Sequence, residues 1–196
     1  MISLAEVMKA ADSNFSPHTV FYAEECRAYY NVLSEKPAGG VVCEVGVQFG
    51  RSSAVALSVA KSIGLEYHAF DCFLYPRESK QIWTDQANGI MGDTPYGVHI
   101  INSFSQDAMA IVDDALKGKP VDVMLIDADH STAGVIADCN LFVHRIPVGG
   151  HLLVHDWENP CFPEVAPACT EYLKQHGGRW ILLGVDMSLA VWKRLE

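Results

Sequence analysis

The sequence lacks any apolar run close to the roughly 20 residues that a membrane-spanning helix needs. It also lacks, at Met1–Glu6, the basic flank and the following apolar stretch of a secretory signal. From these two absences we expect no membrane partner and a location in the cytoplasm.

Basic residues are few and scattered. There are 14 Lys and Arg residues against 24 Asp and Glu residues, which gives a formal net charge of −10. A protein that binds the backbone of a nucleic acid needs a basic face. The sequence therefore predicts no nucleic-acid partner, whereas a neutral or cationic small molecule remains compatible with the charge.

The cysteine pattern lacks any pair spaced as Cys-x-x-Cys. Several of the six cysteines lie inside apolar runs that read as buried elements. This usage favours free thiols in a reducing compartment over a disulfide scaffold. The chain also lacks internal repeats and low-complexity segments, and its 196 residues fit one domain spanning residues 1–196.

What the sequence does contain is a regular alternation of short apolar runs and longer helical stretches, which is typical of a doubly wound α/β domain. The predicted strands are Val41–Val45, Tyr67–Asp71, Val98–Ile101, Val121–Asp127 and His151–His155, with a closing hairpin of Trp180–Val185 and Leu189–Lys193. The predicted helices between them are Arg51–Ile63, Ser105–Leu116, Ala133–His144 and Pro163–His176. We expect a mostly parallel seven-stranded sheet with helices on both faces and a C-terminal antiparallel strand.

Two segments fall outside this plan. Residues 1–40 include a helical stretch around Val20–Leu33 that could lie over a ligand cleft, and an exposed aromatic N-terminal segment would favour a homodimer. Residues 72–97 exceed an ordinary connection and carry the aromatic residues Phe73, Tyr75, Trp83 and Tyr96. A substrate or lid insertion and a surface excursion packed by its own aromatics both remain open for this segment.

The first predicted strand runs into a glycine loop. In an open α/β sheet, ligands bind beyond the carboxyl ends of the strands, so this turn is the first place to look. Gly46 would let backbone approach a ligand closely, Gly50 would relieve crowding at the start of the helix, and Ser52 would face a carboxylate at the helix N-terminus. Gln48 replaces the middle glycine of a dinucleotide fingerprint. Glu44 would repel phosphates and favour an ammonium, such as that of a methionine moiety.

The second predicted strand ends in Asp71. An acid at this position commonly accepts hydrogen bonds from ribose hydroxyls in nucleotide-binding folds. Asp71 therefore supports an adenosine-containing ligand. It could also serve only to cap the loop.

The motifs also resemble those of a known group of enzymes. The stretch from Cys43 to Ser52 resembles the first motif of small class I O-methyltransferases, including catechol O-methyltransferase. Asp127-Ala128-Asp129-His130-Ser131, Gly149-Gly150 and His155-Asp156-Trp157 resemble a bacterial methyltransferase family related to cephalosporin hydroxylase and macrolide O-methyltransferases. The resemblance covers about residues 40–195. It implies a Rossmann-like class I fold, S-adenosyl-L-methionine as the cofactor, and O-methylation of a small-molecule acceptor.

The resemblance also implies a set of cofactor-binding residues. Glu44, Gly46 and Ser52 would contact the methionine part, and Asp71 would contact the ribose. Ser105 and Gln106 resemble a Ser-Gln pair that borders the adenine in catechol O-methyltransferase. The full expected set is Glu44, Gly46, Gly50, Ser52, Asp71, Ser105, Gln106 and Asp127.

Acids and histidines follow the fourth and fifth predicted strands. Asp127, His155 and Asp156 should converge at the edge of the sheet that carries the glycine loop. Two interpretations remain open for them. Related metal-dependent enzymes hold Mg²⁺ with an acid after the fourth strand and an acidic or amide pair after the fifth, although His155 would suit Mn²⁺ or Zn²⁺ better. In the metal-free interpretation, Asp127 and Asp156 form hydrogen bonds around the transferring methyl group.

His130 lies three residues after Asp127, where the resemblance places a general-base lysine. A histidine could take a hydroxyl proton as the methyl group transfers. The predicted catalytic residues are therefore His130, Asp127 and Asp156. His130 could instead cap the next helix with Asp129, and Trp157 could be either an aromatic wall of the acceptor pocket or an ordinary buried residue. Two other functions stay open: an NAD-dependent oxidoreductase and a non-catalytic nucleoside-binding protein.

Overall fold

The computed structural model describes residues 1–13, 21–74, 79–176 and 178–196. Val20 and Tyr75, which belong to segments singled out in the sequence, lie outside these ranges. None of the helices within the ranges is both long enough and apolar enough to cross a bilayer. The expected cytoplasmic location and the expected homodimer stay predictions.

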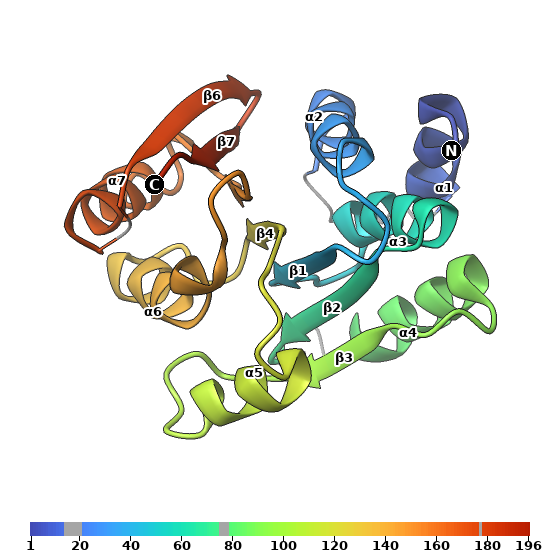
Figure 1. Cartoon of the computed structure of the whole chain (residues 1–196), viewed down its shortest axis with the longest axis horizontal. Coiled ribbons are helices and arrows are strands. Elements are labelled where there is room, and N and C mark those ends of the chain that lie inside the picture. Colours follow the sequence, from blue (N-terminus) through green and yellow to red (C-terminus); the bar gives the residue numbers. More distant parts are fainter. Residues whose placement is uncertain (14–20, 75–78, 177) are drawn as a thin grey trace.

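The described residues form one sheet of seven strands in the order β3-β2-β1-β4-β5-β7-β6 (Figure 1). The strands are β1 (Val41–Val45), β2 (Glu66–Asp71), β3 (Gly97–Ile100), β4 (Val123–Ile126), β5 (His151–Val154), β6 (Trp180–Asp186) and β7 (Leu189–Arg194). Strands β1 to β5 run parallel, while β7 runs antiparallel to both β5 and β6. The predicted mostly parallel sheet with a reversed C-terminal strand is confirmed.

The central strands β1, β4 and β5 are buried at every position. A parallel strand covered by helices on both faces is a nearly continuous apolar run, interrupted here only by Glu44 in β1 and by His151 at the start of β5, and this pattern allowed the strands to be recognised in the sequence. The register pairs Val45 with Ile126, and Ile126 with Val154. The residues that follow these three strands therefore meet at one edge of the sheet.

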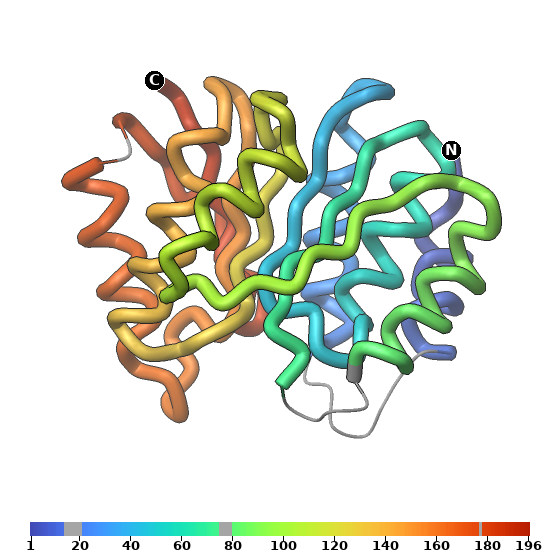
Figure 2. Tube along the Cα trace, turned by 90° about the horizontal axis from the view of Figure 1, so that it is seen from below, coloured from blue at the N-terminus to red at the C-terminus, as the bar shows by residue number. Residues whose placement is uncertain are grey.

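Helices cover both faces of the sheet (Figure 2). One layer contains α1 (Leu4–Ser13), α2 (Ala23–Ser34), α3 (Arg51–Ile63) and α4 (Ser79–Met91). The other contains α5 (Ala108–Leu116), α6 (Thr132–Phe142) and α7 (Val165–His176), with the short 3-10 turn Val143–Arg145. Alternate residues of each strand supply apolar side chains to the two layers, so each layer has its own core.

Helix α5 begins later than predicted, at Ala108 instead of Ser105. The helix is preceded by a turn that begins at Asn102, whose side-chain oxygen accepts a hydrogen bond from the backbone N–H of Phe104. The backbone carbonyl of Asn102 also accepts from the N–H of Ser105. Asparagine stabilises such turns through its own side chain, and so it delays the start of the helix.

The described part of residues 72–97 contributes α4 to the first helical layer. Trp83 of α4 is buried, and its indole N–H donates a hydrogen bond to Ser53 Oγ at 2.9 Å. Its ring also meets that of Tyr96 edge-on, with centroids 5.8 Å apart. These aromatic residues therefore belong to the packed interior of the layer.

Candidate active site

The glycine loop between β1 and α3 brings bare backbone to the edge of the sheet. Gly46 and Gly50 have φ angles of 84° and 87°, a region that favours glycine. A Cβ atom on Gly46 would lie 2.0 Å from the backbone oxygen of Asp127, so no other residue fits there without moving the loop. The predicted need for glycine at position 46 thus has a specific cause, which is contact with the end of β4.

Asp71 holds the glycine loop from the end of β2. Its Oδ2 accepts hydrogen bonds from the backbone N–H groups of Val47 at 2.7 Å and Gln48 at 3.1 Å. Its Oδ1 accepts from the N–H of Phe73 at 2.6 Å. The loop-capping role that the sequence left open is therefore present, and the same side chain also lines the cavity described below.

Glu44 lies in the interior, beneath α3. It is 1% exposed, and its Oε2 accepts hydrogen bonds from Ser53 Oγ at 2.6 Å and from the Tyr67 hydroxyl at 2.5 Å. Burial raises the pKa of Glu44 to about 7, against the effect of these hydroxyl donors. We call Glu44, Ser53, Tyr67 and Trp83 the hydroxyl cluster.

Where β4 and β5 end, five side chains form what we call the histidine cluster: Glu25, Asp127, His130, His155 and Asp156. His155 lies between two acids, with Nδ1 3.1 Å from Asp127 Oδ1 and Nε2 3.3 Å from Glu25 Oε2. Its Nδ1 is also 3.3 Å from Asp156 Oδ2. His130 Nε2 lies 2.7 Å from Asp156 Oδ2 and 3.6 Å from Asp127 Oδ1. Each histidine is thus placed among carboxylates.

Pairing outweighs burial in this cluster. Burial by itself lowers the pKa of His155, while the three carboxylates around it raise that pKa to about 12. Burial also opposes a charge on His130, yet Asp127 and Asp156 raise its pKa to about 9. Burial raises the pKa of both aspartates, but the two histidines hold both values below the ordinary range. The cluster is therefore a set of charged groups that compensate one another.

Glu25 is a member of this cluster that the sequence did not reveal. It is 0% exposed, and its Oε2 accepts from the backbone N–H of Tyr22 at 2.6 Å. Its Oε1 accepts from the N–H and the hydroxyl of Ser188, at 3.0 and 2.8 Å, in the turn between β6 and β7. Together with its contact to His155, Glu25 joins α2, the end of β5 and the C-terminal hairpin.

A cavity of about 740 Å³ opens at this edge of the sheet. The predicted site residues that line it are Gly46, Ser52, Asp71, Asp127, His130, His155 and Asp156. The predicted residues that do not line it are Glu44, Gly50, Ser105 and Gln106. Ser105 closes the turn that begins at Asn102, Gln106 follows it, and the earlier residues Asn102 and Ser103 line the cavity instead.

The cavity also has walls that sequence reasoning missed. Phe21 from the segment before α2 lines it, with its ring centroid 5.2 Å from that of His155. Phe162 lines it as well and stacks on His130 at 4.1 Å. Trp157 is not among the lining residues and packs against Trp192, as an ordinary buried tryptophan does.

The donor set near the cavity also suits a divalent cation. One ligand atom from each of Asp127, His130 and Asp156 can be chosen so that all three lie within 4.8 Å of one another. Two carboxylates and an imidazole suit Mn²⁺ or Zn²⁺ better than Mg²⁺. His155 is placed differently, because its side chain is 2% exposed and both of its ring nitrogens face carboxylates.

Comparison with known proteins agrees with this geometry. Residues 43–157 match a family model described as a methyltransferase domain, whereas no curated protein matches the chain. The structure is similar to CalS11, a TDP-rhamnose 3'-O-methyltransferase of calicheamicin biosynthesis, with 15% identity and a TM-score of 0.66 over 97% of this chain and 92% of that one. It is similar to the O-methyltransferase NovP, with 15% identity and a TM-score of 0.70 over 92% of this chain and 84% of that one. An O-methyltransferase from Bacillus cereus in complex with SAH shares 14% identity, with a TM-score of 0.67 over 98% of this chain and 90% of that one.

Proposed function

The chain belongs to the methyltransferase domain family, and from that membership we propose that it transfers a methyl group from S-adenosylmethionine to a hydroxyl group of a small-molecule acceptor. The observation that carries the proposal is a single cavity that is lined both by the glycine loop with Asp71 and by four members of the histidine cluster, namely Asp127, His130, His155 and Asp156. The Bacillus cereus neighbour binds SAH, and the three neighbours named above are O-methyltransferases. Family membership favours this function over an NAD-dependent oxidoreductase or a non-catalytic binding protein.

In this proposal the cofactor lies along the ends of β1 and β2. Bare backbone at Gly46 and the N-terminus of α3 at Ser52 suit the methionine part, because helix N–H groups attract its carboxylate. Asp71 suits the ribose, since a carboxylate already held by backbone donors can accept a further hydrogen bond. Glu44 is left out of the proposed contacts because it does not line the cavity.

The histidine cluster is suited to handling the proton of the acceptor. S-adenosylmethionine would supply a methyl group bonded to a sulfonium sulfur. The acceptor oxygen would attack the methyl carbon in line, so that an O–C bond forms, the C–S bond breaks and S-adenosylhomocysteine leaves as a neutral thioether. In the proposal, His130 takes the hydroxyl proton at Nδ1 from its neutral form, while its Nε2 stays 2.7 Å from Asp156 Oδ2. Because the pKa of His130 is about 9, the neutral form is a small fraction at pH 7, and the rate of transfer should rise as the pH approaches 9. The carboxylates of Asp127 and Asp156 stabilise the imidazolium that results, and Phe162 fixes the plane of the ring.

The test is methyl transfer from isotope-labelled S-adenosylmethionine to a panel of phenols, catechols and sugar hydroxyls. We expect labelled product with at least one acceptor, and inhibition by S-adenosylhomocysteine. A parallel thermal-shift series compares S-adenosylhomocysteine with NAD. Stabilisation by NAD alone would contradict the proposal, and so would cofactor binding without transfer to any acceptor in a broad panel.

A second role for the same cluster, cation binding, is favoured by the close spacing of its ligand atoms. Asp127, His130 and Asp156 would hold the ion, and a bound divalent cation would lower the pKa of the acceptor hydroxyl. The two roles of His130 exclude each other, so chelation separates them. Loss of activity and of thermal stability in EDTA, both restored by Mn²⁺, Zn²⁺ or Mg²⁺, would support the cation. Unchanged activity and stability would support His130 as the base.

A further inference from the structure

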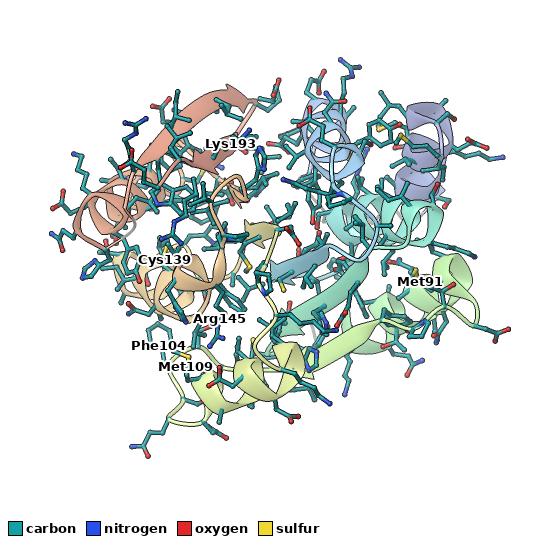
Figure 3. All side chains as sticks on the ribbon, in the orientation of Figure 1. Met91, Phe104, Met109, Cys139, Arg145 and Lys193 are labelled. Atoms are coloured by element: carbon teal, nitrogen blue, oxygen red, sulfur yellow. The ribbon has the colours of Figure 1, made fainter. Side chains whose placement is uncertain are left out.

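Strand β6 is the last strand at one end of the sheet, and it pairs with β7 on one side only (Figure 1). In Figure 3, Lys193 marks β7, which separates β6 from the rest of the sheet. On its other side, β6 has no neighbouring strand among the described residues. The backbone N–H and C=O groups of such an edge can pair with a strand of another chain, so proteins usually protect their edges.

The two edges of this sheet differ in how well they suit such pairing. The other edge strand, β3, has four residues, and only Ile100 among them is exposed. β6 has seven residues, and all of them from Ile181 to Asp186 are exposed. A longer and more exposed edge offers more backbone groups to a second strand, so β6 is the edge that suits pairing better.

The exposed side chains of β6 are mostly apolar. Five large apolar residues of β6 and of the turn after it are between 39% and 60% exposed: Ile181, Leu182, Leu183, Val185 and Met187. Protected edges usually carry lysine, other charges or proline. In β6, Asp186 is the only charged residue, and proline is absent. A row of exposed apolar side chains on an unprotected edge is typical of an interaction surface.

A bulge in β6 turns one of these side chains outward. In the pairing with β7, Leu182 lies opposite Trp192 and Gly184 lies opposite Val191, so Leu183 is the additional residue. A bulge can protect an edge by twisting it away from a neighbour. Here the additional residue is an exposed leucine, and a Cβ atom on Gly184 would meet no described atom within 4 Å. The space beside the bulge is therefore open to an apolar neighbour.

The two ends of β6 carry charges of opposite sign. Arg179 comes just before the strand, and Asp186 ends it. The Arg179 side chain is 66% exposed and lies 3.2 Å from Glu196, an exposed ion pair of the kind that contributes little to stability. In two antiparallel copies of β6, the beginning of one strand lies beside the end of the other, so Arg179 of each copy comes near Asp186 of the other. A parallel arrangement would bring like charges together.

We propose that β6 pairs antiparallel with β6 of a second copy of this chain, and that the two sheets join across a twofold axis. Such an interface uses the same surface on both copies and leaves neither β6 edge open. An unrelated extended peptide would also satisfy the backbone, but a second copy places opposite charges together at both ends. The inference is independent of the proposed function, because no residue of β6 lines the cavity.

Pairing at β6 would also act on the histidine cluster. The turn after β6 carries Ser188, whose backbone N–H and hydroxyl donate to Glu25 Oε1 at 3.0 and 2.8 Å. A second copy that holds β6 in place would therefore stabilise the turn that binds Glu25. Because the association requires the folded chain, the Tm should rise with protein concentration.

The experiment measures the mass of the whole protein by analytical ultracentrifugation over a range of concentrations. We expect twice the mass of one chain at high concentration and dissociation on dilution. Leu183→Lys, present twice in each dimer, should raise the dissociation constant by about 10-fold or more through like-charge repulsion. Ile100→Lys is the matched control on β3, because Ile100 and Leu183 are both 55% exposed, and it should keep the wild-type constant.

Two results would overturn the proposal. A wild-type protein that stays monomeric at every concentration would show that a second copy is not the occupant of this edge. Equal dissociation constants for the wild type and a folded Leu183→Lys variant would place the dimer interface elsewhere. Circular dichroism of each variant establishes that it is folded at the concentrations compared.

An exchange of charges tests the antiparallel direction. Arg179→Glu and Asp186→Arg, made singly, each bring like charges together across the proposed axis and should raise the dissociation constant by about threefold or more. The double variant restores opposite signs, so its dissociation constant should come within about twofold of the wild-type value. A double variant that associates no better than the single variants would overturn the antiparallel pairing.

Discussion

Two groups of buried carboxylates in this molecule differ in what surrounds them. Glu25 in the histidine cluster and Glu44 in the hydroxyl cluster are both almost fully buried. Burial would raise both pKa values, yet His155 holds the pKa of Glu25 below its ordinary range, while Glu44, with hydroxyl donors only, rises to about 7. The chemistry of the partner therefore acts together with the depth of burial in deciding whether a buried acid keeps its charge.

The difference separates two roles. The charged histidine cluster faces the cavity, whereas the hydroxyl cluster lies in the interior beneath α3. Substitutions in the histidine cluster should change the rate of methyl transfer and the free energy of unfolding. Substitutions in the hydroxyl cluster should change stability in a manner that depends on pH.

The largest expected effect is on the rate of transfer in His130→Ala. Removing a general base typically costs 10² to 10⁴ in rate, so we expect kcat to fall about 10³-fold. The KM for S-adenosylmethionine should change by less than about threefold, because His130 belongs to the acceptor side in the proposed arrangement. His176→Ala, an exposed histidine on α7, is the control and should behave as wild type. A His130→Ala enzyme with nearly normal kcat would remove this residue from the mechanism.

The next largest effect is on stability, in Glu25→Ala. Removing one partner of a buried ion pair leaves His155 without its acceptor at Nε2, and such changes cost about 3 to 5 kcal/mol. Urea denaturation should show this loss in the free energy of unfolding. Glu24→Ala, on the exposed neighbour in the same helical turn, should change it by less than about 0.5 kcal/mol. Equal, small effects in the two variants would show that the Glu25 pairing does not stabilise the fold.

The sequence allowed the fold to be predicted because its signals are local. Continuous apolar runs mark the buried parallel strands, and glycines mark the loop after β1. Residues that line the cavity at or just after the end of a strand, such as Asp71, Asp127 and Asp156, could be singled out for the same reason. Their position in the chain places them at the edge of the sheet where ligands bind.

The residues that escaped prediction depend on how helices pack. Glu25 and Asp138 lie inside helical stretches, where an acid ordinarily faces water. For Glu25, no neighbouring residue in the sequence indicates that the side chain points inward. For Asp138, which lines the cavity, there was one signal, because Gly134, four residues earlier, lies where a side chain would collide with Asp129. Ser105 and Gln106 do not line the cavity, whereas Asn102 and Ser103 before them do. The predicted contact of Ser105 and Gln106 with the adenine stays a prediction.

A smaller effect is expected from Glu44→Gln, and it depends on pH. The folded protein holds a proton on Glu44 up to about pH 7, whereas the unfolded chain releases it near the ordinary value of 4.5. The contribution of this proton to stability is therefore full below about pH 4.5 and is lost as the pH rises to 7. From pH 5 to pH 8 the variant should gain about 2 kcal/mol relative to wild type in the free energy of unfolding. A difference that does not change with pH would show that Glu44 is ionised throughout.

The smallest effect, in Tyr67→Phe, tests whether the hydroxyl cluster works through Glu44. Loss of the hydroxyl that donates to Glu44 Oε2 should cost about 1 kcal/mol at pH 6 and more at pH 8, where the carboxylate is charged and depends more on its donors. The same substitution in the Glu44→Gln background should cost a constant amount, so the coupling energy from a double-mutant cycle should grow with pH. Tyr96→Phe, whose hydroxyl donates to the neutral amide of Asn88, is the matched control and should show no such trend. If the coupling energy between Tyr67 and Glu44 did not change with pH, Glu44 would not change its charge between pH 6 and pH 8. The proposed contrast between the hydroxyl cluster and the charged histidine cluster would then be wrong.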